Sequence, residues 1–425
     1  MANRQLTEKL LRDMKKHKES DVLESLQGAM EAKSVKPADI DLTACLESDF
    51  GPDWRRRTSE NGVSDDAMEA IITSGTFNKM AQIVIRNSLR ENPREEYMIS
   101  NMVGTESRGE CEESYKDFGA FSDIKVHEVG ELEAGPDYGL STDWLQHPNG
   151  KAVAAGVAFT REAMCKDPNG YLMQQIPKLR DAHDLYREEK LVDAMIGYNV
   201  TWNRSDTDYD IFYDSGYGSV FDSGANGPWI NASAEAIVCG EDLQVVKNIF
   251  YDMTDMVHGH RTTMNIFYDM TDMVHGRPMS MDVNGLDVFT SQRTRDRINP
   301  ILNATSVERD ATCPGSGDTI HYFMSPEIAN GMTFSPKAYI RLMQAIASRY
   351  SLTTAKANEW IFFGKLTEFL AWTYQVQPEV RRLTLAAQDQ KKRVVARYDS
   401  YSKGYAWIKD PQKAMWITGS ESDSI

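Results

Sequence analysis

One long segment of the sequence has too little apolar content to form a core of its own, and this limits the folds open to the chain. Residues 97–163 lose helical periodicity and contain two β-like pieces, DIKVHEV at 123–129 and VAAGVAF at 153–159. An acidic stretch with Gly and Pro separates these pieces. Because an isolated two-stranded hairpin is marginal in water, we expect an extended excursion that lies on another subunit.

The excursion offers acids for charge pairing and apolar side chains for burial. We expect the acids to face Lys or Arg of a neighbouring copy, and the apolar side chains to be buried there. The expected contact residues are Glu128, Glu131, Glu133, Asp137, Tyr138, Leu140, Trp144 and Leu145. Trp144 is the expected anchor, because tryptophan is enriched among interface residues whose truncation costs about 2 kcal/mol or more. A solvated loop with an incidental tryptophan is the alternative.

Helical periodicity marks segments on both sides of the excursion. Residues 4–35 and 65–91 have the spacing of amphipathic helices, and 167–197 that of a long helix that stops at Gly197. In the N-terminal helix the expected contact residues are Leu6, Leu10 and Met14. A helix this polar needs a partner to be stable. We therefore expect it to pack on a neighbouring subunit or to serve in assembly.

The second half of the chain reads as alternating strands and helices. Residues 198–232 fit strands and an aromatic-anchored loop, and 354–375 mix a helical start with a buried apolar stretch. A helix is expected at 335–350, with Ser335 as its cap and Pro336 as its first residue. Three strands are expected at the end, at 392–400, 405–409 and 413–418, separated by turns at Ser402-Lys403-Gly404 and Asp410-Pro411.

An exact internal repeat interrupts this pattern. NIFYDMTDMVHG occurs at 248–259 and again, letter for letter, at 265–276. A solenoid would need at least three related units, so the two copies indicate a tandem duplication. We expect one copy to pack and the other to be accommodated at a surface.

The sequence contains none of the motifs that would identify an enzyme. A phosphate-binding P-loop, a GxGxxG turn, HExxH and GxSxG are all absent. His258 and His260, and the alternating acids Asp206, Asp208 and Asp210, fit solvated surfaces better than metal sites. We expect no metal, no cofactor and no enzymatic activity. The 63 acids leave a carboxylate-dependent hydrolase as an alternative.

The charge balance limits the kinds of partner that the chain is expected to bind. With 47 Lys and Arg against 63 Asp and Glu, the formal charge is −16, which disfavours sequence-specific DNA binding. No apolar run approaches the roughly 18–20 residues that cross a bilayer, and the N-terminus has no secretory signal. We expect no membrane partner. Five cysteines without close pairs fit reduced thiols in a cytoplasm.

Several phrases, taken in order, resemble the major capsid proteins of tailed bacteriophages, the Hong Kong 97-like family. They are AIITSGTFNKMAQIVI at 70–85, VAAGVAFTREAMCKDPNG at 153–170, REEKLVDAMIG at 187–197, HGRPMSMDVNGLDVF at 275–289, INPILNATSVER at 298–309 and RYDSYSKGYAWIKDPQKAMWITG at 397–419. The resemblance implies an α+β fold, the Hong Kong 97-like capsid fold. Its parts are an N-arm, an extended two-stranded E-loop, a peripheral domain with a long spine helix, and an axial domain.

The resemblance also implies a division of the chain. The implied parts are an N-terminal arm with helices at 1–96, the E-loop with flanking strands at 97–163, the peripheral domain with the spine helix at 164–232, the axial domain at 233–375, and closing peripheral strands with a tail at 376–425. The tandem repeat departs from the family pattern. Some relatives remove an N-terminal segment as a scaffolding region; we expect it to be kept here.

The implied function is that of a major capsid protein that self-assembles into an icosahedral shell around double-stranded DNA. Its partners would be copies of itself in hexamers and pentamers, with portal, scaffolding and decoration proteins as further candidates. The packaged DNA would be held without sequence-specific binding, and the shell would be assembled in the host bacterial cytoplasm and belong to the virion. The alternatives are a cellular encapsulin-like nanocompartment shell of the same fold and an unrecognised acidic-site hydrolase.

Overall fold

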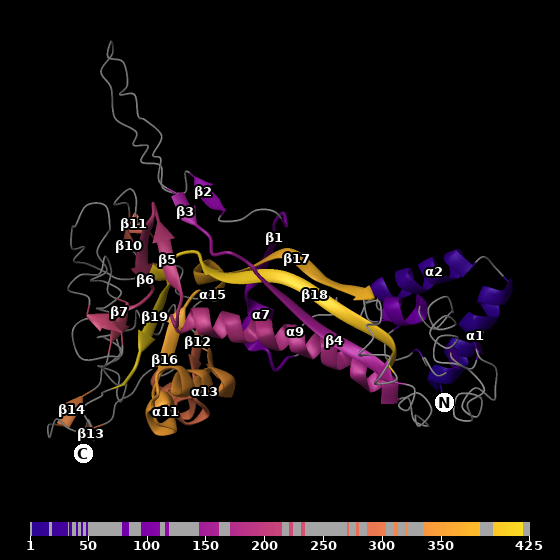
Figure 1. The fold of residues 1–425 in the computed structure, drawn as a ribbon. Helices are drawn as coiled ribbons and strands as arrows, with labels where there is room; N and C mark the ends of the chain where they lie inside the picture. The colour runs from indigo at the N-terminus through magenta and orange to yellow at the C-terminus, as the bar shows by residue number, and fades with distance from the viewer. Residues whose placement is uncertain are drawn as a thin grey trace, which may run out of the picture.

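The computed structural model of the chain is elongated, with a strand-rich part at one end and the N-terminal helices at the other (Figure 1). The structure describes residues 2–16, 19–32, 34–35, 40, 44–45, 48–49, 79–84, 95–110, 115–118, 144–160, 171–214, 221–223, 231–233, 270–271, 278–279, 287–302, 310–312, 319–321, 335–382 and 394–419. Helices and strands alternate without a regular βαβ order, so the expected α+β class is confirmed.

A long helix lying on a four-stranded sheet joins the two ends; we call this unit the arm. Helix α9 (Tyr171–Met195) has 25 residues and so spans about 37 Å. The sheet has the order β1-β17-β18-β4, with β1 parallel to β17 and the other pairs antiparallel. Its strands are β1 (Gly104–Ser107), β4 (Lys151–Thr160), β17 (Leu370–Arg382) and β18 (Val394–Ile408).

Glycine ends α9 where the sequence predicted. Gly197 has φ of 71°, and its N–H donates to the carbonyl of Ala194, while the N–H of Tyr198 donates to that of Asp193. This is the left-handed ending that glycine adopts without steric cost. A Cβ at this position would lie 2.9 Å from the Phe212 ring. The expected stop is therefore confirmed.

A seven-stranded sheet and its helices form the strand-rich end, which we call the body. The sheet has the order β15-β12-β16-β19-β9-β7-β8. Its strands are β7 (Tyr213–Asp214), β8 (Asp222–Ser223), β9 (Ala232–Ser233), β12 (Asp287–Thr290), β15 (Ser335–Ala338), β16 (Ile361–Gly364) and β19 (Ala414–Ile417). Its helices are α7 (Met98–Met102), α11 (Gln292–Leu302), α13 (Ile340–Arg349), α14 (Thr354–Ala357), α15 (Leu366–Phe369) and η3 (Pro411–Lys413).

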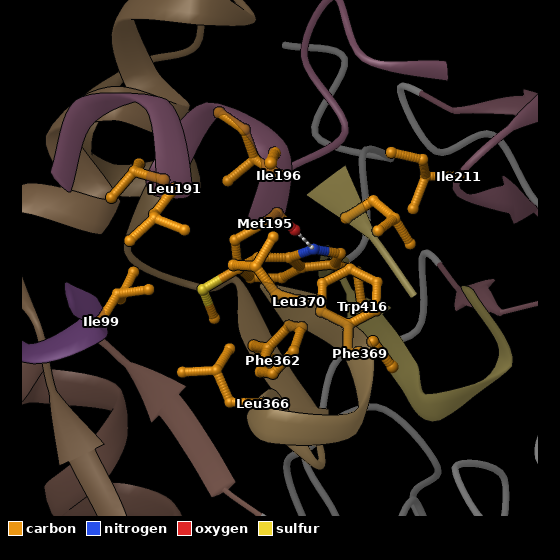
Figure 2. Close-up of a cluster of buried hydrophobic side chains, with 14 of the residues drawn as sticks. Ile99, Leu191, Met195, Ile196, Ile211, Phe362, Leu366, Phe369, Leu370 and Trp416 are labelled. Carbon is orange, nitrogen blue, oxygen red and sulfur yellow. Dashed lines mark hydrogen bonds between the residues drawn. The ribbon is translucent and has the colours of Figure 1, made fainter. Parts of the chain in front are cut away.

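The end of α9 is part of the main hydrophobic core (Figure 2). Trp416 of β19 lies at its centre, and its indole Nε1 donates to the carbonyl of Met195 at 3.0 Å. The rings of Phe362 and Trp416 meet edge to face, with their centroids 5.2 Å apart. The body and the arm therefore share one core at this point.

The remaining strands that the structure describes form three further sheets. The sheet β2-β3-β5-β6 is antiparallel throughout. Its strands are β2 (Lys116–Phe118), β3 (Trp144–Gln146), β5 (Thr201–Arg204) and β6 (Thr207–Asp210). Two antiparallel pairs join β10 (Met270–Thr271) to β11 (Pro278–Met279) and β13 (Asp310–Thr312) to β14 (Thr319–His321).

A second core lies at the other end of the arm; we call it the distal cluster. It packs α1 (Ala2–Lys16) and α2 (Glu19–Glu31) against Leu179 of α9 and Tyr398 of β18. Its other buried members are Leu11, Leu26, Met30, Ile40, Ala44, Cys45, Met80, Ala81 and Val84. The single helix expected at 4–35 is therefore wrong. The chain forms two helices, which lets both apolar faces share this core.

Two further expectations at local signals are wrong. Ser335 and Pro336 do not start a helix: they begin β15, and α13 starts only at Ile340. Proline is tolerated there because β15 is the edge strand of its sheet. Likewise, Ser402-Lys403-Gly404 is no turn, because β18 runs through it.

Two further strands are placed by their pairing. β4 pairs with β18 over its whole length, and the strand at 123–129 that we expect to pair with it lies outside the described residues. β19 lies between β16 and β9 in the body. The turn at Asp410-Pro411 is confirmed, with the Asp410 carboxylate accepting from the N–H of Gln412 at 3.0 Å.

Several expectations fall outside the described residues. The strand at 123–129 lies outside them entirely, and so does the first copy of the tandem repeat. In the second copy only β10 is described. Within the helix expected at 65–91, residues 79–84 are described and are helical.

Gly404 lets Trp372 and the backbone of β17 approach β18 closely. An added Cβ would lie 2.8 Å from Cζ2 of Trp372 and 2.9 Å from the carbonyl oxygen of Thr373. We expect Gly404→Ala to lower the free energy of unfolding by about 2 kcal/mol, because the backbone oxygen cannot move aside. Denaturant unfolding measures this. The control is Gly104→Ala in β1, where nothing lies within 4 Å of the added Cβ; equal losses in both variants would contradict the prediction.

Candidate functional site

The junction where α9 enters the body contains a buried, fully engaged carboxylate. Glu188 of α9 is 1% exposed. Its Oε1 and Oε2 accept from the N–H groups of Ile99 and Ser100, at 3.1 and 2.8 Å. The hydroxyls of Ser100 and Tyr339 also donate to this carboxylate. A buried charge is tolerable only with such donors, so Glu188 ties α9 to α7 and to the start of α13.

Arg187 binds the same turn of α7 from the other side. Its Nη2 donates to the carbonyl of Ser100 at 3.0 Å. Its guanidinium carbon lies 6.0 Å from the centre of the Trp372 ring and 5.8 Å from that of Tyr374. Two consecutive residues of α9 therefore hold Ser100 and bring β17 into the junction.

A second contact joins α9 to the end of α13. Nε of Arg349 lies 3.0 Å from Oδ1 of Asp193, and Nζ of Lys190 lies 3.3 Å from Oδ2 of the same carboxylate. The hydroxyl of Tyr350 donates to the carbonyl of Ile196 at 2.6 Å. Between this contact and Glu188 the two helices border a groove of about 240 Å³. α9 is thus fixed to α13 at two points.

Burial dominates the electrostatics of the junction. It raises the pKa of Asp184 to about 6, although Arg180 and Arg187 lower it. Burial, and then the neighbouring Glu188 carboxylate, raise the pKa of Tyr339, so its hydroxyl stays protonated and donates. Each oxygen of Glu188 accepts two hydrogen bonds, whereas Nε of Arg187 is buried and has no hydrogen-bond partner among the described residues. The geometry of the junction suits it to fixing the angle between arm and body.

Two buried histidines stabilise the arm in their neutral form. Nε2 and Nδ1 of His183 lie 2.6 and 3.0 Å from the hydroxyls of Ser400 and Ser402. The His147 ring packs on Trp407 with centroids 3.9 Å apart. Burial, and then the nearby Arg108, lower the pKa of His147 to about 4. Burial also lowers the pKa of His183.

Metal sites, membrane-spanning helices and free cysteines are absent or rare in the described part of the chain. Among its residues no group of three or more His, Cys, Asp or Glu side chains could hold a metal ion. None of its helices combines the length and the apolar character that a membrane crossing requires. The only described free cysteine is Cys45, which is buried in the distal cluster.

The structure describes two of the residues expected to contact a neighbour through the excursion. Trp144 is half-buried in β3, with Nζ of Lys116 4.1 Å from the centre of its ring. Leu145 is 5% exposed and packs in its own chain's main core. It therefore has little surface left for a neighbour, and the expectation is corrected for this residue. The other six lie outside the described residues: Glu128, Glu131, Glu133, Asp137, Tyr138 and Leu140.

The three N-terminal contact residues are partly used within the chain. Leu6, Leu10 and Met14 are half-buried against the distal cluster. Their remaining exposed surface leaves a contact with a neighbour as a prediction.

Sequence reasoning missed the residues of the junction. Glu188 and Asp193 fall in an ordinary charged stretch, and their partners come from α7 and α13, far away in the sequence. The only local signal is their helical position: α9 buries His183 and, four and five residues later, Arg187 and Glu188.

The comparisons with known proteins found similar solved structures only. No protein-family model and no curated protein matches the chain. The mature capsid of bacteriophage PhiM1 is 9% identical, with 76% of this chain and 87% of that chain covered and a TM-score of 0.40. The capsid of an empty GTA particle is 11% identical, with coverages of 78% and 92% and a TM-score of 0.42. The cyanophage Pam1 capsid is 13% identical, with coverages of 76% and 89% and a TM-score of 0.41.

These neighbours are capsids, the kind of protein that the sequence resembles. All three TM-scores are below 0.5, and no identity among these three exceeds 13%.

Glu188 should matter far more than its neighbour in the sequence. We expect Glu188→Gln to lower the free energy of unfolding by about 2–3 kcal/mol, because an amide offers one acceptor to donors that now meet two. Denaturant unfolding measures the loss. Glu189→Gln is the matched control, since Glu189 is exposed; its effect should stay within about 0.5 kcal/mol. Equal effects would show that the junction does not depend on this carboxylate.

The lowered pKa of His147 predicts that the folded chain loses stability on acidification. This pKa is about 4 in the folded chain against 6.5 for an ordinary histidine, so the unfolded chain binds the extra proton between these values. Stability should fall as the pH drops from about 6.5 to 4, by up to about tenfold in the folding equilibrium per pH unit. His147→Phe keeps a ring and removes the titration.

The difference between parent and variant isolates His147 from Asp184, whose raised pKa acts in the opposite direction. Free energies of unfolding measured from pH 4 to 8 should converge below pH 6.5 or cross in favour of the variant. Curves that run parallel over this range would contradict the assignment.

Proposed function

We propose that the chain is the major capsid protein of a tailed bacteriophage or prophage, which self-assembles into an icosahedral shell around double-stranded DNA. The observation that carries the proposal is the separation of the two cores. One lies in the body and the other at the far end of the arm, and α9 contributes Leu179 to the second and Leu191 to the first. The long helix and the long strands of the arm bridge this distance (Figure 1).

An elongated subunit of this kind suits a container. A shell subunit must touch several neighbours at once, and overlapping arms bury more surface than flat contacts do. The junction at Glu188 and Asp193 fixes the arm to the body, so less conformational freedom is lost when copies assemble. The net charge of −16 suits a wall that encloses DNA without binding its phosphates tightly.

The partners follow from this proposal. Copies of the same chain are the main partner, in hexamers and pentamers, with the virion as the location and the host cytoplasm as the site of assembly. The excursion between β2 and β3 corresponds to the E-loop and lies on a neighbouring copy, with Trp144 at its root. The N-terminal helices serve as a second contact. No enzymatic step is assigned to the chain.

The experiment that tests this function compares the parent with a chain that lacks the excursion. β2 and β3 are antiparallel, and Phe118 lies opposite Trp144, so a two-residue Asn-Gly turn can join them in place of residues 119–143. We expect the parent to form closed megadalton shells in electron microscopy. The shortened chain should unfold at nearly the same temperature but form few closed shells, because it has lost an intersubunit contact.

Two outcomes decide separate points. A parent chain that stays a monomer or small oligomer would overturn the capsid function. Shells that form equally well from the shortened chain would show that the excursion is not an intersubunit arm. Trp144→Ala, in the full-length chain, should reduce shell yield less than the deletion does, because Trp144 is already half-buried in β3.

A further inference from the structure

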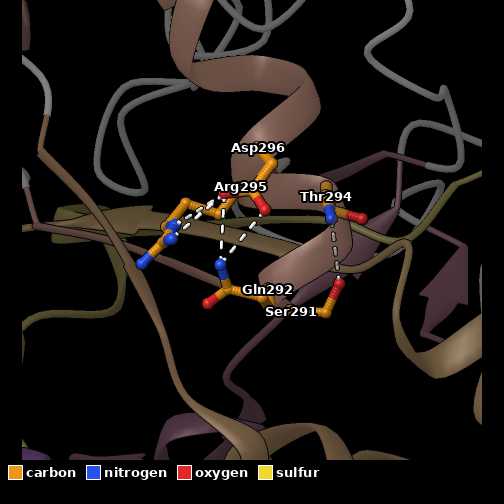
Figure 3. A network of polar contacts seen from close by, with 5 residues as sticks. All are labelled: Ser291, Gln292, Thr294, Arg295 and Asp296. Carbon is orange, nitrogen blue, oxygen red and sulfur yellow. Dashed lines mark hydrogen bonds and ion pairs between the residues drawn. The ribbon is translucent and has the colours of Figure 1, made fainter.

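Helix α11 carries positive charge that the described residues of its own chain do not neutralise. It has three arginines and a single acid, Asp296. That acid is already occupied: Nη2 of Arg295 lies 3.0 Å from its Oδ1, and Nε2 of Gln292 donates to both of its oxygens, at 3.2 and 3.1 Å (Figure 3). Arg293 and Arg297 are exposed, and neither forms an ion pair with any residue that the structure describes.

The helix holds these two arginines in a fixed position. Ser291 caps it by accepting from the N–H of Thr294 at 3.2 Å (Figure 3). The hydroxyls of Ser291 and Thr294 both donate to the carbonyl of Asn358, at 2.8 and 2.6 Å. Arg293 and Arg297 are four residues apart and so lie on one face of the helix, about 6 Å apart along its axis.

An exposed apolar residue lies at the same end of the body. Ile340, the first residue of α13, is 67% exposed, and it is the one exposed large hydrophobic side chain among the described residues. β15, against which α11 packs, leads directly into it. Nη2 of Arg341, the residue after Ile340, lies 3.9 Å from Oε2 of Glu96 in the same chain. An exposed large apolar side chain beside arginine is typical of protein–protein interfaces.

The complementary charge lies on the hairpin formed by β5 and β6. Its turn, Ser205-Asp206, has φ of 49° and 63°, as in the tight two-residue turns that match strand twist. Asp208 and Asp210 are both exposed and point to the face opposite the buried Trp202. Nδ2 of Asn203 donates to Asp208 at 2.7 Å, which orients that carboxylate.

The two charged pairs match in spacing. Residues two apart on a strand are about 6.6 Å apart, close to the roughly 6 Å between arginines four apart on a helix. No ion pair of the described residues involves Asp208 or Asp210. In Figure 1, α11 lies at the bottom of the body, and β5 and β6 lie at its top. One copy therefore cannot pair these surfaces with each other.

We propose that Arg293 and Arg297 of one copy bind Asp208 and Asp210 of the next copy, with Ile340 in the same contact. The inference rests on the proposed function and names one of its intersubunit contacts. Because the two surfaces differ, the contact is head-to-tail, and such contacts close into rings when the rotation between copies fits. The charges set partner and orientation, and the apolar contact adds affinity.

Charge reversal with rescue tests this contact. We expect Arg293→Glu with Arg297→Glu to reduce assembled particles at least about tenfold, and Asp208→Lys with Asp210→Lys to do the same, because like charges then face each other. The four changes combined in one chain should restore assembly to within about twofold of the parent, because each contact then has both signs reversed. Electron microscopy and sedimentation count the particles, and thermal unfolding checks each fold.

A charge-matched control separates the contact from net charge. Arg293→Glu with Arg297→Glu is combined with Glu110→Lys and Glu189→Lys, two exposed acids outside the proposed contact and outside the N-terminal helices. This chain has the parent's net charge but should stay defective. Recovery of assembly in this control chain would overturn the proposal, and so would a failure to recover in the four-change chain. The proposal would also be overturned if both charge-reversed pairs assembled as well as the parent. If the variant with Asp208→Lys and Asp210→Lys fails to fold, Asp208→Asn with Asp210→Asn takes its place. This second variant must form fewer particles, and their yield must depend less on salt concentration than that of the parent.

These outcomes are distinct from a failure of the proposed function. A parent that forms no particles overturns the capsid function itself. A parent that forms particles, with variants that do the same, overturns only the contact.

Discussion

The arrangement of the whole chain depends on one buried carboxylate. Glu188 receives two backbone N–H groups from α7 and the hydroxyls of Ser100 and Tyr339, so its charge is compensated without a cation in direct contact. Since an unpaired buried carboxylate would be prohibitive, α7 and the start of α13, which supply these donors, must meet α9 at one place. That requirement sets where α9 leaves the body and in which direction the arm extends.

The two cores on either side of this junction differ in character. The main core is dense in aromatic rings: Trp416 contacts Trp360 and Phe362, and Phe362 contacts Phe369. The distal cluster has mostly aliphatic members and includes a single buried aromatic residue, Tyr398. Stability is therefore concentrated in the body, while the far end of the arm has fewer large contacts.

Local patterns predicted the elements whose signals are local. The long helix and its end at Gly197 follow from periodicity and from the left-handed conformation of glycine, and the turn at Asp410-Pro411 follows from its residues. Gly404 misled the prediction because glycine serves turns and close packing alike, and only the Trp372 ring shows which applies. Ser335-Pro336 has the pattern of a helix start, but pairing with β12 makes it a strand.

The junction could not have been predicted by such means. Glu188 receives bonds from residues 88, 89 and 151 positions away, and nothing in its own neighbourhood distinguishes it from Glu189. For the excursion, acidity and low apolar content predicted a contact with another subunit but did not show where each side chain lies. Leu145 belongs to the chain's own core. A single sequence does not show which exposed residues form a contact between copies.

The position of β19 has a consequence for the order in which the chain can fold. This strand, the last one among the described residues, inserts between β16 and β9, in the interior of the seven-stranded sheet. Until residues 414–417 have left the ribosome, β16 and β9 have no partner on their facing edges, and the Trp416 ring is missing from the main core. The body is therefore complete only once these residues have emerged. Until then its sheet keeps two open strand edges, which are templates for pairing with other chains.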